Sequence, residues 1–394
     1  LGRGLRHAHG KDCLTVLDFV GQTHRRYRLD TRFAALLMRQ RQRIDREIEN
    51  DFPNLPPGCN IQLERVARER VLAKVKAVLA DLNHFIPETI QTWSQESDHP
   101  LTFGHFISAT GLSPVEVLRR RSWSEWKAIA MKQPMPNNPD IDALRKALPR
   151  IALRNDPDLL RQFLDINATH EVSNSRVAIA LHYLRWGKTG TALGMSHIAE
   201  SATRWQKNPS IVADAEEIAT WRLQHPTTPL GDIPLPFPCF LKLHAEYGSA
   251  EIKAALGLAT LESAGPTGQG VIHDPTHNCY IHLVTFRKDD RFFSPTTRYR
   301  DYPISATKLH WESQSTTSQN STTGQNYLHF KERGYTVLFF ARVERQVDGE
   351  TVPFVYLGPA KALLSAESDR PIRMVWELEY PIPAILLEGA LPAT

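Results

Sequence analysis

Residues 225–238 read His-Pro-Thr-Thr-Pro-Leu-Gly-Asp-Ile-Pro-Leu-Pro-Phe-Pro. Five of these fourteen residues are proline, which lacks a backbone N–H and disrupts the interior of a helix or a central strand. Helix-type spacing of apolar residues dominates before this segment, and short β-type runs dominate after it. The segment therefore predicts a boundary between a helical region and a β-rich region.

The sequence upstream of this boundary predicts helices. Apolar side chains recur at intervals of three and four, as in Gln62–Leu82 and Val177–Trp186. No fixed-period repeat is visible, which argues against a solenoid. We predict that residues 51–225 form a helical coupling region and that residues 226–239 form a proline-rich linker.

Two local features sharpen the prediction for the helical region. Ser113 precedes Pro114, and this order suits the start of a helix because serine caps the first turn and proline fits at its first position. Trp123 and Trp126 are more typical of a buried core than of a ligand platform.

Residues 240–394 carry the pattern of a β-rich domain. An amphipathic helix at Tyr247–Leu256 precedes several short strand candidates, and the polar stretch Gln314–Gln325 predicts a mobile loop. The strand candidates are Gly270–His273, Tyr280–Arg287, Lys308–Glu312, Thr336–Val343, Val352–Leu357 and Ile372–Glu379. This arrangement predicts a curved sheet or open barrel, and an α+β multidomain chain as a whole.

The N-terminal residues Leu1-Gly2-Arg3-Gly4-Leu5-Arg6 precede an apolar run at Cys13–Gly21. Glycines allow a tight turn, and arginine donates fixed hydrogen bonds to a transferring phosphoryl group without losing its charge. A basic surface loop before a core strand is the alternative. The combination resembles the last motif of a superfamily 2 helicase of the DEAD/DEAH type. The resemblance implies that residues 1–50 end a second RecA-like domain and that Arg3 and Arg6 sense ATP in an intact motor.

The sequence has no Gly-x-x-x-x-Gly-Lys-[Ser/Thr] loop that would bind ATP and Mg²⁺. We therefore expect a C-terminal fragment that is inactive alone and binds no cofactor, with ATP and Mg²⁺ bound only in the intact protein. Its expected partners include missing N-terminal helicase or nuclease domains.

The composition is that of an ordinary globular protein. The 394 residues are 41% hydrophobic and 23% charged, with a formal net charge of +4. Residues 1–50 hold 11 Lys and Arg against 6 Asp and Glu, an excess that could line a phosphate groove or simply form a solvated helix face. The four cysteines are scattered, and no apolar run suits a membrane span, so we expect a cytoplasmic protein.

Histidines near Cys279 do not form a convincing metal site. His273, His277 and His282 alternate across a candidate strand, which places them partly on opposite faces. We predict no metal at this position.

The C-terminal region carries a series of short motifs in order. They include Leu243-His244-Ala245, Glu251-Ile252, Phe286-x-Lys288, Ser294-Pro295-Thr296-x-x-Tyr299-x-Asp301, Leu309–Ser315, Leu338-Phe339-x-Ala341-Arg342 and Phe354-x-Tyr356-Leu357-Gly358. This series resembles the uncharacterised C-terminal domain of restriction-like superfamily 2 helicases over residues 240–388. The resemblance implies a bacterial restriction or repair system, and a terminal domain similar to the SRA or PUA-like folds that read modified bases.

The residue types in this region permit DNA recognition. A base is read after it leaves the stack, between flat groups that also satisfy its polar edge. Tyr299, Tyr302 and Trp311 offer flat faces, while Asp301, Ser313 and Gln314 offer donors and acceptors. Lys288, Lys308 and Arg342 are candidates for phosphate contacts. The alternative is a structural role: Trp311 as a core tryptophan, Tyr299 and Asp301 as a stabilising Tyr–Asp pair, and Gln314 as the start of a loop.

The preferred interpretation is the C-terminal part of an ATP-dependent DNA helicase or translocase whose terminal domain binds double-stranded DNA, with modified cytosine as a possible target. The alternative is that the terminal domain is a structural or protein-interaction cap without base recognition. A nuclease in the β-rich domain is less favoured, because Glu377-Leu378-Glu379 lacks the following lysine of an Asp/Glu-x-Lys motif.

Overall fold

The computed structural model describes residues 48–49, 63–96, 100–169, 175–226, 231–267, 270–288, 301–347 and 349–390. The chain divides into two compact units, one of residues 1–81 and 109–111 and one of residues 82–108 and 112–394. The predicted RecA-like remnant lies outside the described residues except for residues 48–49, and so do Arg3 and Arg6.

In the first unit, helix α3 (Arg65–Ala80) agrees with the helix predicted at residues 62–82. Its surface carries an ion pair between Arg65 Nε and Glu69 Oε1, 3.2 Å apart and one helical turn along the chain. Lys76 Nζ lies 2.5 Å from Glu49 Oε1. This unit contributes no described residue to the candidate site discussed below.

The second unit begins with short helices, and both local predictions made for them are confirmed. The Ser113 side chain accepts from Val115 N at the start of α6, and Glu116 completes a capping box. Trp123 and Trp126 are fully buried. The helices are α4 (Leu82–Glu96), α5 (Phe103–Thr110), α6 (Pro114–Leu118), α7 (Trp123–Ala130), α8 (Ile141–Leu144), α9 (Ala147–Ala152), α10 (Pro157–Thr169), α11 (Arg176–Trp186), α12 (Ile198–Gln206) and α13 (Pro209–Gln224), with a 3₁₀ turn at Thr191–Leu193.

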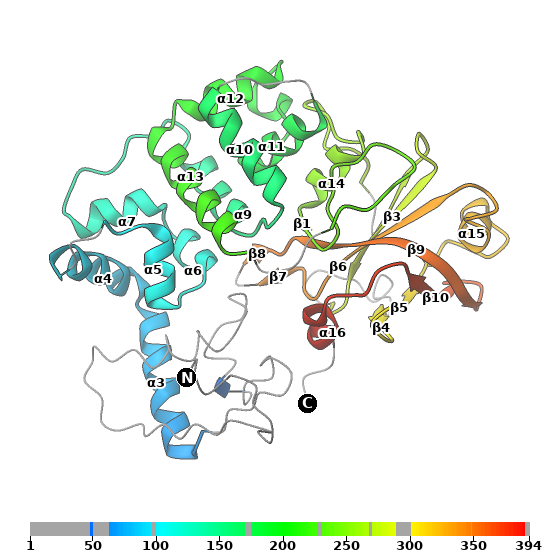
Figure 1. Ribbon diagram of the computed structural model, residues 1–394, viewed down its shortest axis with the longest axis horizontal. Coiled ribbons are helices and arrows are strands. Elements are labelled where there is room, and N and C mark those ends of the chain that lie inside the picture. The colour runs from blue at the N-terminus through cyan, green and yellow to red at the C-terminus, as the bar shows by residue number, and fades with distance from the viewer. Residues whose placement is uncertain are drawn as a thin grey trace, which may run out of the picture. The chain divides into compact units, whose positions relative to one another are not determined.

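The β-rich part is an eight-stranded mixed sheet with the order β2-β3-β6-β9-β10-β5-β4, and β1 pairs with β9 (Figure 1). The strands are β1 (Glu246–Tyr247), β2 (Val271–Asp274), β3 (Cys279–Thr285), β4 (Tyr302–Pro303), β5 (Lys308–Glu312), β6 (Thr336–Arg342), β9 (Phe354–Glu367) and β10 (Arg373–Leu378); β7 (Gln346–Val347) and β8 (Glu350–Thr351) form a separate hairpin. Helices α14 (Ser249–Ala255), α15 (Thr322–Leu328) and α16 (Ala384–Ala390) accompany the sheet. The α+β organisation is confirmed, and the described sheet is not a closed barrel.

Two neighbouring strands of this sheet run parallel. β3 and β6 pair in register from Cys279↔Thr336 to Thr285↔Arg342, whereas the other pairs are antiparallel. The carboxyl ends of β3 and β6 therefore lie together, and polar side chains at that edge can share one site.

Strand β9 is the longest strand, and it joins the two parts of the sheet. Its first half pairs with β6, as far as Leu338↔Pro359, and its second half pairs with β10, from Leu378↔Ala360 to Arg373↔Glu367. Figure 1 shows it as a long curved ribbon. Register shifts lie along both pairings, and such irregularities bend a strand and increase its twist.

Two predictions for this region were wrong in extent. The strand predicted at Val352–Leu357 continues to Glu367. The polar stretch Gln314–Gln325 is not wholly a loop, because α15 begins at Thr322 with Ser321 as its capping residue. The Ser321 hydroxyl accepts a hydrogen bond from Gly324 N, so a serine that suggested a loop starts a helix.

The helical region and the β-rich region meet through buried polar contacts within the second unit. Arg154 donates two hydrogen bonds to Glu251, at 2.6 and 2.8 Å, and both side chains are buried. The Tyr247 hydroxyl donates to Asp156, and the side-chain oxygen of Asn155 accepts from Glu246 N at 2.8 Å. These contacts join the segment after α9 to β1 and α14.

Candidate functional site

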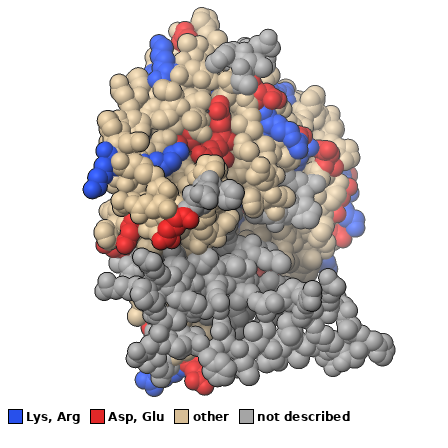
Figure 2. Space-filling view, turned by 60° about the vertical axis from the view of Figure 1, so that its left-hand side comes forward, with Lys and Arg blue, Asp and Glu red and all other residues tan. Residues whose placement is uncertain are grey.

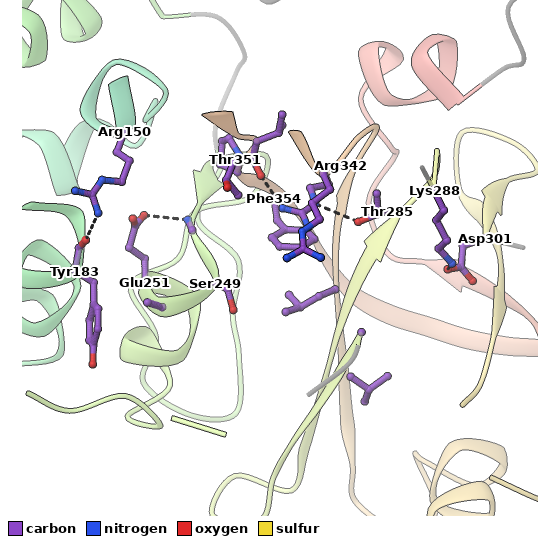
Figure 3. Close-up of a pocket in the computed structure, with 18 of the residues that line it drawn as sticks. Arg150, Tyr183, Ser249, Glu251, Thr285, Lys288, Asp301, Arg342, Thr351 and Phe354 are labelled. Carbon is purple, nitrogen blue, oxygen red and sulfur yellow. Dashed lines mark hydrogen bonds and ion pairs between the residues drawn. The ribbon is translucent and has the colours of Figure 1, made fainter. Parts of the chain in front are cut away.

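A cavity of about 620 Å³ lies where the helical region meets the sheet. Its walls come from the end of α9, from α11, from the start of α14, from the carboxyl ends of β3 and β6, and from the entry to β9 (Figure 3). This volume lies in the range of about 300–1,000 Å³ that is usual for sites of small organic ligands. The cavity is the candidate functional site.

Arg342 is the central basic residue of this cavity (Figure 3). It is the last residue of β6, beside its register partner Thr285 at the end of β3. Arg342 Nε donates to Thr285 Oγ1 at 3.1 Å and Nη1 donates to Val352 O at 2.9 Å, while Cζ lies 4.0 Å from the centre of the Phe354 ring. Burial, with a smaller effect from the charge of Arg345, lowers the pKa of Arg342 to about 10, so the guanidinium stays charged at neutral pH.

Arg150 stands on the helical side of the cavity. Its guanidinium donates to the carbonyls of Tyr183 and Arg185 at 3.3 and 2.9 Å, and Nε donates to Lys146 O at 2.9 Å. The first two carbonyls belong to the last turn of α11, where a cation also balances the negative end of the helix dipole. Burial lowers the pKa of Arg150 to about 10.

The acidic residues of the cavity wall are already paired. Glu251 binds Arg154, Asp301 Oδ2 lies 2.6 Å from Lys288 Nζ, and Glu312 Oε1 lies 3.4 Å from Arg373 Nε. Burial raises the pKa of the Asp301 carboxyl, although Lys288 opposes this effect. With five basic and three acidic residues in the wall, the cavity carries a surplus of positive charge.

Five of the nine residues predicted to contact nucleic acid line this one cavity. They are Lys288, Asp301, Trp311, Gln314 and Arg342. They come from β5 and β6, from the segments that follow β3 and β5, and from the segment that precedes β4.

Trp311 belongs mainly to the core of the sheet. Only 4% of it is exposed, and its ring stacks on His282 with the ring centres 4.2 Å apart. Tyr327 meets the same ring edge-on, and Met374 is its register partner on β10. Trp311 therefore forms part of the cavity wall while one of its faces is already occupied by a histidine.

Ser313 and Gln314 differ in what they can offer a ligand. Ser313 is fully buried; its N–H donates to Ile372 O at 3.0 Å and its hydroxyl accepts from Ile372 N at 2.9 Å, so both groups continue the contact between β5 and β10. Gln314 is half-buried, lines the cavity, and accepts a long hydrogen bond from the Thr317 hydroxyl at 3.4 Å. Gln314 is thus the better placed of the two for a ligand.

The remaining predicted residues lie elsewhere. Lys308 is exposed at the start of β5, and Tyr302 is 45% exposed and stacks on His310 with ring centres 4.6 Å apart. Neither residue lines the cavity. Tyr299 lies outside the described residues.

Several residues of the cavity had no clear signal in the sequence. Arg150, Arg154 and Tyr183 come from the helical region, more than 60 residues from Glu251, and nothing in the spacing indicates that they meet. Glu251 and Phe354 did fall in motifs of the C-terminal series, but without an assigned role.

Across the described ranges, no group of three or more His, Cys, Asp or Glu side chains is arranged to hold a metal ion. His277 instead contacts the buried Asp274, with Nδ1 2.6 Å from Oδ2. Among the helices that the structure describes, none combines the length and the apolar character needed to cross a bilayer.

The surface seen in Figure 2 carries basic and acidic side chains in small alternating groups over a mostly uncharged background. On this face, the described residues thus show charge of both signs rather than one broad basic field.

No curated protein matches the chain. Residues 241–389, which form less than half of the chain, match the family model described as a domain of unknown function, DUF3427.

Proposed function

We propose that this chain is the C-terminal part of an ATP-dependent DNA helicase or translocase of a bacterial restriction or repair system. In this proposal the C-terminal domain binds double-stranded DNA through the cavity beside Trp311. The observation that supports it is the surplus of arginine in that cavity, since phosphate contacts from Arg and Lys supply most of the affinity of proteins for DNA.

The cavity also suits one unstacked base better than a continuous duplex. A nucleotide that leaves the helix needs an enclosed pocket with an apolar wall and a few polar groups for its edge. Leu283 and Pro353 supply apolar wall, and the amide of Gln314 supplies a donor and an acceptor. Recognition of a modified cytosine, in a domain of SRA or PUA-like type, is the most specific form of the proposal.

The motor part of the proposal concerns residues that the structure does not describe. Arg3 and Arg6 would contact the γ-phosphate of ATP, with Mg²⁺, in the intact protein. The helical region would pass the motion of the motor to the C-terminal domain, and its buried contacts with that domain suit mechanical coupling.

The same buried contacts favour a second candidate function. A domain held to its neighbour by a buried Arg154–Glu251 pair could serve as a structural cap on the motor and bind no DNA. The two candidates differ in one measurable property, which is the affinity of the full chain for DNA.

The deciding experiment is binding of the full chain to matched duplexes, unmodified or carrying 5-methyl- or 5-hydroxymethylcytosine, over a salt series. We expect binding that weakens with salt, and that weakens further in Arg342→Gln. Arg161→Gln is the matched control, because Arg161 is exposed on α10 and pairs with the nearby Asp158. Equal affinity for all duplexes would leave DNA binding without base recognition. Absence of binding to every duplex would contradict the proposal and favour the cap.

Trp311→Ala is a poor variant for this purpose. Trp311 is packed in the sheet core, and removal of a buried tryptophan typically costs about 3–5 kcal/mol of stability. Loss of binding would then report unfolding. Gln314→Ala tests base recognition at a smaller structural cost, because Gln314 is half-buried and its side chain contacts only polar groups, the hydroxyls of Thr317 and Tyr327, among the described residues.

A further inference from the structure

Arg342 is held rigidly before any ligand arrives. A hydroxyl, a carbonyl and an aromatic ring contact its guanidinium from three directions, through Thr285, Val352 and Phe354. These contacts fix the plane of the group and leave Nη2 without a hydrogen-bond partner among the described residues. A ligand therefore meets a preorganised donor, and little side-chain freedom remains to be lost on binding.

Among the described residues, no carboxylate contacts the Arg342 guanidinium. Each acidic residue of the cavity wall is engaged by another cation: Glu251 by Arg154, Asp301 by Lys288, and Glu312 by Arg373. Within the described residues, the guanidinium of Arg342 contacts neutral groups alone. A partly buried cation without a neighbouring anion is left uncompensated, so an anionic ligand would be stabilised at this position.

The rest of the wall indicates the kind of anion. Leu283, Val271 and Pro353 form an apolar surface near Arg342, and the cavity of about 620 Å³ is far larger than one phosphate ion needs. A ligand that uses both features carries a compact anionic group and a flat, weakly polar body. Nucleoside phosphates have this combination.

We infer that the cavity is a nucleotide-phosphate site, in which the phosphate lies against Arg342 and the nucleoside lies against the apolar wall. The inference rests on the proposed function for the source of the nucleotide, which would be one unit of a DNA strand. A free nucleotide has the same chemistry, and the experiment separates the two sources.

The experiment is calorimetric titration of the full chain with deoxycytidine monophosphate (dCMP), deoxycytidine and inorganic phosphate. We expect dCMP to bind saturably, with deoxycytidine and phosphate each weaker by about tenfold or more, because charge-assisted hydrogen bonds to phosphate are strong. Arg342→Gln should reduce dCMP to the affinity of deoxycytidine, Arg342→Lys should retain part of it, and Arg161→Gln should leave it unchanged. Equal affinity for dCMP and deoxycytidine in the unaltered chain would overturn the inference without reference to any variant.

A second variant tests the same site in case Arg342→Gln fails to fold. Thr285→Val removes the hydroxyl that orients Arg342 while it keeps the shape of the strand residue. It should weaken dCMP binding and leave the circular dichroism spectrum unchanged. An unchanged affinity for dCMP in both Arg342→Gln and Thr285→Val would contradict the inference.

Competition with duplex DNA distinguishes failure of the inference from failure of the proposed function. Displacement of DNA by dCMP supports both. Binding of dCMP by a chain that binds no duplex supports the site with a free nucleotide as its ligand and contradicts the DNA function. DNA binding that is insensitive to dCMP and to Arg342→Gln contradicts the inference and leaves the DNA function standing.

Discussion

His282 lies in the core of the sheet as an ionisable residue without a hydrogen bond. It is fully buried, its ring stacks on Trp311, and neither ring nitrogen has a hydrogen-bond partner in the described part of the chain. Phe339 and Trp376 contact the ring edge-on. Burial lowers the pKa of His282 to about 3, so the neutral form is the folded form at ordinary pH.

This histidine should make the fold sensitive to acid. In the unfolded chain a histidine takes up a proton near pH 6.5, whereas the folded chain resists protonation until about pH 3. The free energy of unfolding should therefore fall as the pH drops between these values, by up to about 1.4 kcal/mol per pH unit from this residue. We predict that His282→Phe has a shallower loss of stability, measured by urea unfolding at pH 7, 5.5 and 4.5. His84→Phe, at an exposed position, should keep the original slope; equal slopes for all three proteins would contradict the prediction.

At the scale of single elements, the end of α11 depends on one glycine. Gly187 has a φ of +65°, in the left-handed region, and a Cβ added there would lie 1.9 Å from Arg150 Nη1. The backbone therefore favours glycine, and an added methyl group would also displace the Arg150 guanidinium. We predict that Gly187→Ala lowers the free energy of unfolding by about 1–3 kcal/mol.

The matched control for this prediction is Gly194→Ala. Gly194 also has a positive φ, +70°, but no atom lies within 4 Å of an added Cβ. The difference between the two variants in urea unfolding isolates the contact with Arg150. If both lose the same stability, the backbone alone accounts for the effect and Arg150 moves without cost.

Sequence patterns predicted elements better than they predicted element ends. Periodicity placed α11, β5 and β10 to within a residue or two, because each is a short run rich in apolar residues that ends at a clear change of composition. It missed the second half of β9, where Gly358, Pro359 and Lys361 interrupt the β pattern. The bend that allows β9 to serve two neighbours needs such residues, so the signal that usually ends a strand here marks a curve within it.

At the scale of the whole second unit, one buried ion pair joins its two regions. Arg154 and Glu251 are each 4% exposed in their side chains and are 97 residues apart in the chain. Removal of one partner leaves the other charged and buried, which typically costs about 3–5 kcal/mol. We predict a loss of this order for Arg154→Met alone and for Glu251→Leu alone, and a loss for the double variant that is smaller than the sum of these two.

Urea unfolding of the two single variants and the double variant gives this coupling as a double-mutant cycle. Arg161→Gln provides the comparison at an exposed pair, where a change of at most about 1 kcal/mol is expected. Additive losses in the cycle would show that Arg154 and Glu251 stabilise the fold independently.

The candidate site could be predicted only in part, because its walls come from two regions on either side of the proline-rich segment. The C-terminal motifs led to Asp301, Trp311, Gln314 and Arg342, which the fold brings to one cavity. They could not lead to Arg150, because that wall belongs to a region beyond the proline-rich segment. Composition marked that segment as a linker, yet side-chain contacts cross it, and such contacts leave no local periodicity to detect.

The buried pair between Arg154 and Glu251 also constrains how such a protein can be inherited. Proline-rich segments are natural points for recombination, since an exchange there disrupts no helix or strand. A C-terminal domain transferred to a new parent at residues 226–239 would bring the Glu251 carboxylate without its arginine. The exchange would succeed only where the recipient supplies a cation at the same place, so the two regions should descend together as one evolutionary module.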